Sequence, residues 1–324
     1  MITLSHIHKT FHVTRREGGM KAAAKALFRR KRETVEALSD VSFQIGSGEM
    51  VGYIGPNGAG KSSTIKIMSG ILTPDSGECL IDGVTPWKQR KEHVKNIGVV
   101  FGQRSQLWWD VPVIDSFELI RDIYSVPPDE YRRNKDRLTE LLNLSELLQT
   151  PVRQLSLGQR MRCEIAASLL HSPRILFLDE PTIGLDAVSK IAVRDFILQL
   201  NRERGTTVIL TTHDMQDIEA LTNRILLIGK GRILLDGSLD ELKRRRSSVK
   251  TIAVSFAGEL PPLPDGITVR EKQTGRAVLE LDTTRQKASE AIAFLSAHAE
   301  LTDLSVSSTS VEEMVVGLYQ EYRI

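Results

Sequence analysis

The chain is poor in the features that mark secreted, disulfide-linked or membrane-spanning proteins. Its 324 residues include two cysteines, Cys79 and Cys163, far apart and without metal-ligand spacing. This predicts neither a disulfide framework nor a zinc site, and favours a reducing cytoplasm. The longest apolar runs, such as Ile175 to Leu178, fall well short of the roughly 20 residues that cross a bilayer. The first residues lack the basic and apolar segments of a secretion signal.

An excess of charge of one sign is also missing, because the net charge is only +2. A protein that binds nucleic acid commonly carries a strongly basic face, so no nucleic-acid partner is expected. One local cluster departs from this balance, with eight basic and two acidic residues from Arg15 to Glu33. This basic insertion, placed at residues 12–34, is either a solvated hairpin or a surface for anionic lipid headgroups or a partner.

The composition, with 41% hydrophobic and 26% charged residues, is that of an ordinary soluble globular chain. Strands are expected at residues 2–11 and 41–54. From Met50 to about Asp236, short apolar runs alternate with helical patterns, which predicts a largely parallel sheet covered by helices. Residues 116–150 show a continuous helical pattern, inside a helical subdomain expected at about 104–172.

A second, smaller domain is expected at the C-terminal end. A charged stretch at 243–248 and the prolines between Pro261 and Pro264 separate residues 249–324 from the preceding pattern. These residues predict two strands, a helix near 286–297, a further strand and a last helix. Ser310 and Glu313 have the spacing of a capping box at the start of that last helix. The chain is therefore divided into residues 1–240 and a C-terminal α+β domain at 249–324.

A glycine-rich loop follows the expected strand that ends at Ile54 and precedes a helical pattern. It is a full G-x-x-x-x-G-K-S match. Glycines let the backbone curl with its N–H groups pointing at phosphate oxygens, and the helix start adds its positive pole. Lys61 can then reach the β- and γ-phosphates, while the Ser62 hydroxyl coordinates Mg²⁺. The residues of this loop are Gly55, Pro56, Asn57, Gly58, Ala59, Gly60, Lys61 and Ser62.

Two carboxylates end a strand that is expected to be buried on both faces. Asp179 and Glu180 follow the apolar run from Ile175 to Leu178, and strand ends of a parallel sheet meet at the edge where the phosphate loop lies. Asp179 is predicted to hold Mg²⁺, and Glu180 to polarise the attacking water.

A second helix start also suits an anion. Ser156 and Gln159 fit a capping box, with Gly158 between them, at the beginning of a helix that runs to about Leu170. Because the phosphate loop already has a helix of its own, this second positive pole makes sense if it faces the nucleotide bound by another copy of the chain. An ordinary capped helix is the alternative.

In this order and spacing, the motifs resemble those of the ATP-binding cassette ATPases that power membrane transporters, over residues 1 to about 240. The resemblance implies an α/β fold: a P-loop cassette with a mixed or parallel sheet core, an antiparallel β subdomain and the inserted helical subdomain. Gly55 to Ser62 is similar to the family's Walker A loop, Ser156 to Gln159 to its signature, and Asp179 with Glu180 to its Walker B end.

The resemblance also implies roles for residues outside these motifs. Gln103 is similar to the Q-loop glutamine, which contacts the metal and the water, and His213 to the switch histidine, whose alternative role is capping a helix that starts at Asp214. Asp186 lies in a D-loop, and Ser63 replaces a common threonine. Phe11 is the candidate for stacking on adenine, with a plain core position as the alternative. The implied cofactors are ATP and Mg²⁺.

Finer similarity points to the ATPases of ABC-2 type export systems, whose permeases are separate polypeptides. Trp108 and Trp109 occupy the place where such ATPases receive the permease, or else fill the subdomain core. The expected assembly is a head-to-tail homodimer, or a heterodimer with a related ATPase, at the cytoplasmic face of the cell membrane. The alternatives are a soluble cassette ATPase acting on nucleic acid or ribosomes, and a P-loop kinase for a small molecule.

Overall fold

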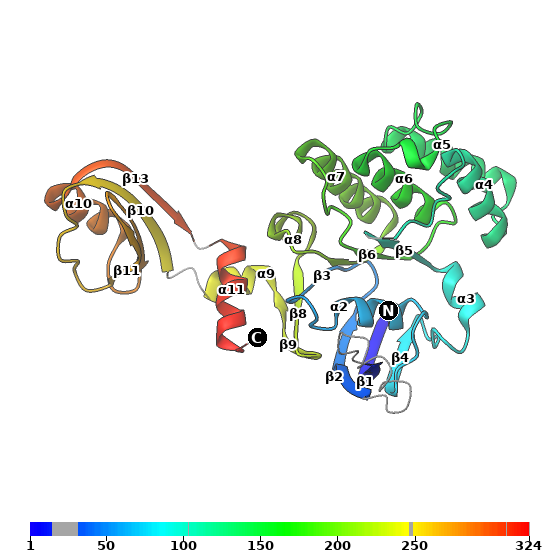
Figure 1. The fold of residues 1–324 in the computed structure, drawn as a ribbon, viewed down its shortest axis with the longest axis horizontal. Helices are drawn as coiled ribbons and strands as arrows, with labels where there is room; N and C mark the ends of the chain where they lie inside the picture. The colour runs from blue at the N-terminus through cyan, green and yellow to red at the C-terminus, as the bar shows by residue number, and fades with distance from the viewer. Residues whose placement is uncertain (15–31, 103, 246–248, 309, 324) are drawn as a thin grey trace, which may run out of the picture. The chain divides into compact units, whose positions relative to one another are not determined.

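A six-stranded sheet lies at the centre of the first part of the computed structural model, which describes residues 1–14, 32–102, 104–245, 249–308 and 310–323 (Figure 1). Its strand order is β5-β6-β7-β3-β8-β9. These strands are β3 (Met50–Ile54), β5 (Ile97–Phe101), β6 (Ile175–Asp179), β7 (Thr207–Thr211), β8 (Arg224–Gly229) and β9 (Arg232–Ser238). The pairs from β5 to β8 are parallel. The strands β6, β7 and β8 are buried along nearly their whole length and each has an apolar run at its centre, as strands covered on both faces do. The predicted largely parallel sheet is confirmed.

A three-stranded antiparallel sheet lies against this core, in the order β2-β1-β4. It consists of β1 (Ile2–Thr14), β2 (Arg32–Ile45) and β4 (Ser76–Ile81). The expected single strand at 41–54 is wrong, because a turn at residues 46–49 separates the end of β2 from β3. Both ends of the predicted basic insertion belong to paired strands, and its middle, residues 15–31, lies outside the described residues.

Helices cover the central sheet and form the subdomain between β5 and β6 (Figure 1). They are α2 (Lys61–Met68), α3 (Arg90–Lys95), α4 (Val113–Tyr124), α5 (Pro128–Leu141), the short 3₁₀ helix η1 (Val152–Gln154), α6 (Leu157–Leu169), α7 (Ala187–Arg204) and α8 (Met215–Leu221). The helical pattern at 116–150 corresponds to two helices followed by turns, and not to one uninterrupted helix. Ser125 takes a left-handed conformation with φ 52°, and a residue before proline avoids the helical region, so α4 ends before Pro127 and α5 begins at Pro128. None of the helices in the described ranges combines the length and apolar character that spanning a bilayer requires.

The chain divides into two compact units, Met1–Asp236 and Gly237–Ile324. The second contains α9 (Leu239–Arg245), β10 (Val249–Ala257), β11 (Ile267–Gln273), β12 (Arg276–Asp282), α10 (Ala288–His298), β13 (Glu300–Ser308) and α11 (Val311–Glu321). Three strands precede α10 instead of the expected two. The weakest sequence signal among the three is that of β11, which lacks alternation because Ile267 is its one buried residue. The predicted capping box of Ser310 and Glu313 is present.

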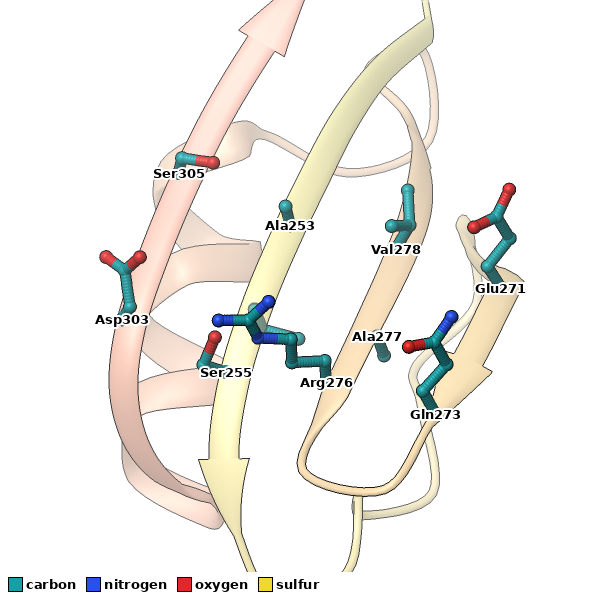
Figure 2. Close-up of a pocket in the computed structure, with 10 residues that line it drawn as sticks. Ala253, Ser255, Glu271, Gln273, Arg276, Ala277, Val278, Asp303 and Ser305 are labelled. Atoms are coloured by element: carbon teal, nitrogen blue, oxygen red, sulfur yellow. The ribbon is translucent and has the colours of Figure 1, made fainter.

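The four strands of this second unit form one antiparallel sheet in the order β11-β12-β10-β13. One face packs on α10 through a buried cluster that includes Ile252, Leu279 and Leu295. A hollow of about 380 Å³ is lined by polar and small side chains of this sheet. Figure 2 shows these side chains, among them Arg276 and Asp303. The α+β character that was expected for this region is thus observed.

Candidate functional site

The loop between β3 and α2 has the backbone shape that a phosphate cradle needs. Gly58 and Gly60 have left-handed φ angles of 79° and 114°. A Cβ atom at Gly60 would lie 2.7 Å from the carbonyl oxygen of Ala37, so the loop also packs too closely for a side chain there. Gly60 is the N-cap of α2 and offers no side chain to the first helical N–H groups. These N–H groups and the helix dipole therefore favour an anion at this end.

Lys61 lies across this loop. Its Nζ donates hydrogen bonds to the carbonyl oxygens of Gly55 at 2.6 Å and Pro56 at 3.2 Å, and the residue is buried. Burial lowers the pKa of the Lys61 ammonium, while the nearby charges of Glu180 and Asp179 act in the opposite direction. The charges of Lys61, Asp179 and Glu180, which were predicted to bind phosphate, metal and water, therefore lie close enough to interact.

Asp179 and Glu180 stand at the end of β6, as predicted. Thr211, opposite on β7, donates from Oγ1 to Asp179 Oδ1 at 2.6 Å. The Glu180 backbone leaves the strand in a left-handed conformation, with φ 57°. Gly102 donates its N–H to the Asp179 carbonyl at 2.7 Å, and a Cβ at Gly102 would lie 2.5 Å from the Glu180 carbonyl oxygen. A glycine before the Q-loop position therefore lets the two loops approach.

His213 forms a pair with Glu180. Its Nε2 lies 2.8 Å from Glu180 Oε1, and both side chains are partly exposed. The alternative role for His213, capping of α8, falls to another residue. Asp214 is the N-cap and accepts the N–H of Gln216 at 3.0 Å. The structure therefore brings together Lys61, Asp179, Glu180 and His213 at one edge of the sheet.

The signature segment begins α6 with the predicted capping box. Ser156 Oγ accepts the N–H of Gln159 at 3.2 Å, and Gln159 Oε1 accepts the N–H of Ser156 at 2.8 Å. Leu157, between Ser156 and Gly158, is accommodated because Gly184 faces it. A Cβ at Gly184 would lie 2.6 Å from Leu157 Cδ2. Within the described residues, no hydrogen bond or ion pair joins the signature segment to the phosphate loop.

Asp186, expected to lie in a D-loop, is near this segment. Its carboxylate caps α7 by accepting the N–H of Ser189 at 2.9 Å and the Ser189 hydroxyl at 2.9 Å. A Cβ at Gly158 would lie 2.6 Å from the same Ser189 hydroxyl oxygen. Ser189 therefore connects the start of α6 with the D-loop of the same chain.

Two predicted site residues are less well placed by the structure. Gln103 lies outside the described residues. Phe11 is a half-buried residue of β1, with the Lys9 Nζ 5.8 Å from its ring centre. It is not among the residues of the buried core cluster, so the plain core alternative is wrong, and its contact with adenine stays a prediction.

The two tryptophans point outward. Trp108 is 59% and Trp109 51% exposed, whereas the preceding Leu107 is buried. Core filling by the tryptophans, one of the two alternatives, is therefore wrong. Arg160 of α6 lies over the Trp109 ring at 5.8 Å.

Sequence reasoning missed Glu164, a buried carboxylate on α6. It accepts hydrogen bonds from the Ser105 hydroxyl and, at 3.1 Å, from the Gln106 N–H. Gln106 Nε2 in turn donates to the Glu164 carbonyl at 3.0 Å. Burial raises the pKa of Glu164, although these hydrogen bonds act against that rise. The sequence did contain a signal for Glu164, because this acidic residue stands between Cys163 and Ile165 in a helix whose other buried residues are mostly apolar.

Comparisons with known proteins agree with this geometry. The family model described as ABC transporter matches residues 38–183. The ABC transporter ATP-binding protein NatA of Bacillus subtilis is 33% identical over 215 residues, which are 66% of this chain and 87% of NatA. The daunorubicin resistance ATP-binding protein DrrA3 of Streptomyces coeruleorubidus is 31% identical over 292 residues, 87% of this chain and 91% of DrrA3. Methionine import ATP-binding proteins are similar as well.

A solved structure is similar in fold. It is the dimeric, post-hydrolysis state of the ATP-binding cassette MJ0796 bound to ADP and Pi. The TM-score is 0.62 and the sequence identity 27%, and the match covers 74% of this chain and 99% of that one.

Proposed function

The chain belongs to the family of ABC transporter ATP-binding proteins, and we propose that this ATPase drives export through a separate membrane permease of the ABC-2 type. The direction of transport is inferred from the length of the match to DrrA3, a protein named for drug resistance. That match covers 292 residues and therefore extends beyond the 236 residues of the first unit. On this proposal the protein lies at the cytoplasmic face of the cell membrane, held there by its permease.

The observation that supports the chemistry is the pairing of Glu180 with His213 at 2.8 Å, beside Lys61 and Asp179. The loop N–H groups and Lys61 bind the phosphates, and Glu180 orients the attacking water, with His213 donating to the γ-phosphate. The Ser62 hydroxyl and the Asp179 carboxylate are hard oxygen donors of the kind that Mg²⁺ prefers. Asp179 Oδ1 is already held by Thr211, which orients the carboxylate for such a role. Mg²⁺ at this place would neutralise charge that develops on the phosphates.

Two copies acting together account for the signature segment. Ser156 and Gly158 lie at a capped helix start, and among the residues that the structure describes they make no hydrogen bond or ion pair to the phosphate loop. Each nucleotide would therefore lie between the Lys61 loop of one copy and the Ser156 helix of the other. Binding of ATP then favours the closed pair and hydrolysis releases it, which is how a ligand shifts a two-state equilibrium.

The permease is proposed to dock beside the exposed tryptophans. Gln106, two residues before Trp108, lines a hollow of about 150 Å³ together with Phe101, Tyr124 and His171. This hollow lies between the helical subdomain and β5. Exposed aromatic residues close in sequence to a residue of this hollow suit an anchor for a short helix of a partner.

The test of the chemistry uses the purified full chain. ATP turnover should rise more steeply than linearly with protein concentration, and Ser156→Arg should suppress turnover while leaving nucleotide binding by the separated monomer unchanged. Equal loss of turnover and binding would contradict the two-copy site. A phosphorylated small-molecule product would instead support the kinase alternative.

The test of the partner uses co-expression with a permease of the ABC-2 type. The wild-type chain should co-purify with it from membranes, and the variant Trp108→Ala/Trp109→Ala should not. Tyr322→Ala, an exposed aromatic of the second unit, is the matched control. Salt-sensitive binding of RNA without a membrane partner would support the soluble nucleic-acid alternative.

A further inference from the structure

Asp217 is a fully buried carboxylate on α8 to which no sequence motif assigns a role. Both of its oxygens are engaged. Oδ1 accepts from Arg194 Nε at 2.5 Å, and Oδ2 accepts from the hydroxyl of Thr212 at 3.1 Å and from the hydroxyl of Thr182. Thr182 and Thr212 are buried as well. A buried carboxylate that accepts hydrogen bonds from several segments holds these segments together.

The two threonines belong to the loops that carry Glu180 and His213. Thr182 follows Glu180 by two positions, and Thr212 directly precedes His213. The Thr212 hydroxyl also accepts the N–H of Asp214 at 3.0 Å, so its hydrogen bonds bridge across His213. One carboxylate oxygen therefore fixes the backbone on both sides of the Glu180–His213 pair.

The sheet cannot do this by itself. The last paired rung between β6 and β7 joins Asp179 to Thr211, and Glu180 donates its N–H to the Thr211 carbonyl at 2.9 Å. Beyond this last pair of residues the two segments separate, the one after β6 leading to α7 and the one after β7 leading to α8. Glu180 moreover has a left-handed backbone conformation, which costs free energy for a residue other than glycine. Contacts from the surrounding residues must therefore maintain it.

From this geometry we propose that Asp217 is a positioning residue that holds the Glu180 loop and the His213 loop in register through Thr182 and Thr212. The proposal rests on the proposed roles of Glu180 and His213. Arg194, on α7, makes the arrangement rigid because it balances the buried charge and ties α7 to α8. An ionised carboxylate accepts several hydrogen bonds and donates none, which suits three converging donors.

The expected consequence falls on turnover, and not on nucleotide binding. The polar contacts of Asp217 lead to the Glu180 and His213 loops, whereas Lys61 is held by carbonyl groups of its own loop. A displacement of about 1 Å at a reacting group can cost roughly 10²-fold in rate. Losing one threonine hydroxyl should therefore lower kcat about 10-fold, and losing the Asp217 charge about 10- to 100-fold.

The experiment compares matched threonine variants of the full chain. Thr182→Val and Thr212→Val keep the shape but remove the hydroxyl, whereas Thr182→Ser and Thr212→Ser keep the hydroxyl. We expect the valine variants to lose about 10-fold in kcat with little change in the KM for ATP, and the serine variants to keep kcat within about twofold. Valine variants with unchanged kcat would overturn the proposal, as would serine variants that lose as much as valine. Asp217→Asn extends the series, and the threonine pairs decide the question if it fails to fold.

A double-mutant cycle separates positioning from general stability. In a His213→Ala background, Thr212→Val should cause almost no further loss of kcat, because the two changes act through one group. Losses that simply multiply would overturn positioning of His213 by Thr212. If His213→Ala and Glu180→Gln themselves leave kcat unchanged, the proposed chemistry fails. If they lower kcat and the threonine variants do not, the positioning role alone fails.

Discussion

The ammonium of Lys61 donates to the carbonyl oxygen of Gly55 at 2.6 Å, so the lysine is held by the loop that it is expected to serve. This places a buried positive charge at the start of α2.

Replacing Lys61 with alanine should remove most of the affinity for ATP. Hydrogen bonds to charged groups contribute about 1.5–3 kcal/mol each, so the Kd should rise at least about 10- to 100-fold. Fluorescent nucleotide titration of the full chain measures this. Lys66→Ala, on the same helix, is the control and should bind as the wild type does.

Replacing Glu180 with glutamine should separate hydrolysis from binding. The amide retains the size of the side chain but cannot act as a base, so turnover should fall roughly 10²- to 10⁴-fold while ATP still binds. An ATP-bound dimer should accumulate in size-exclusion chromatography. The exposed Glu146→Gln is the control, and normal hydrolysis by Glu180→Gln would remove this residue from the water-orienting role.

Truncating Glu164 should loosen the segment that leads to the tryptophans. Glu164→Ala removes the acceptor of the partly buried N–H of Gln106, which should lower the unfolding free energy by about 0.5–1.5 kcal/mol. Glu164→Gln keeps an acceptor and should lose less. Thermal unfolding measures both, with the exposed Glu140→Ala as the control. Equal loss in the two Glu164 variants would show that the hydrogen bonds are not what the residue contributes.

The first unit should lose stability in mild acid because of His171. Burial lowers the pKa of this imidazole from 6.5 to about 4, against the opposing hydrogen bond to the Ile97 carbonyl. The folded state therefore favours the neutral ring, and unfolding takes up a proton between these two values. The contribution of the neutral His171 ring to the free energy of unfolding is on the order of 3 kcal/mol. It is present above about pH 6.5 and is lost as the pH falls toward 4.

Denaturant titrations of the wild type and of His171→Gln across this pH range measure the effect. The variant should show a shallower dependence, with part of it remaining because burial lowers the pKa of His93 as well. The exposed His298→Gln is the control. A pH dependence of His171→Gln equal to that of the wild type would contradict the assignment.

Local sequence patterns predicted the parts of the site that are built from neighbouring residues. The glycines before Lys61, the acids after β6 and the capping boxes at Ser156 and Ser310 each depend on a few consecutive positions. The break between α4 and α5 was missed although Pro127 and Pro128 stood in the pattern.

Contacts between distant segments were not predictable in this way. Asp217 meets Thr182 across 35 positions, and Glu164 meets Gln106 across 58. A single sequence gives the residue types but not which loops the fold brings together. One of the three strands before α10 was missed for a different reason, since an exposed strand such as β11, with one buried residue, has no periodic signal.

The close fit of Leu157 against Gly184 links two motifs that lie far apart in the chain. A hybrid cassette assembled from this protein and a relative should therefore receive both positions from the same parent. An exchange that places a larger residue at position 184 beside Leu157 would push the segments around these two positions apart, even where each motif by itself matches well.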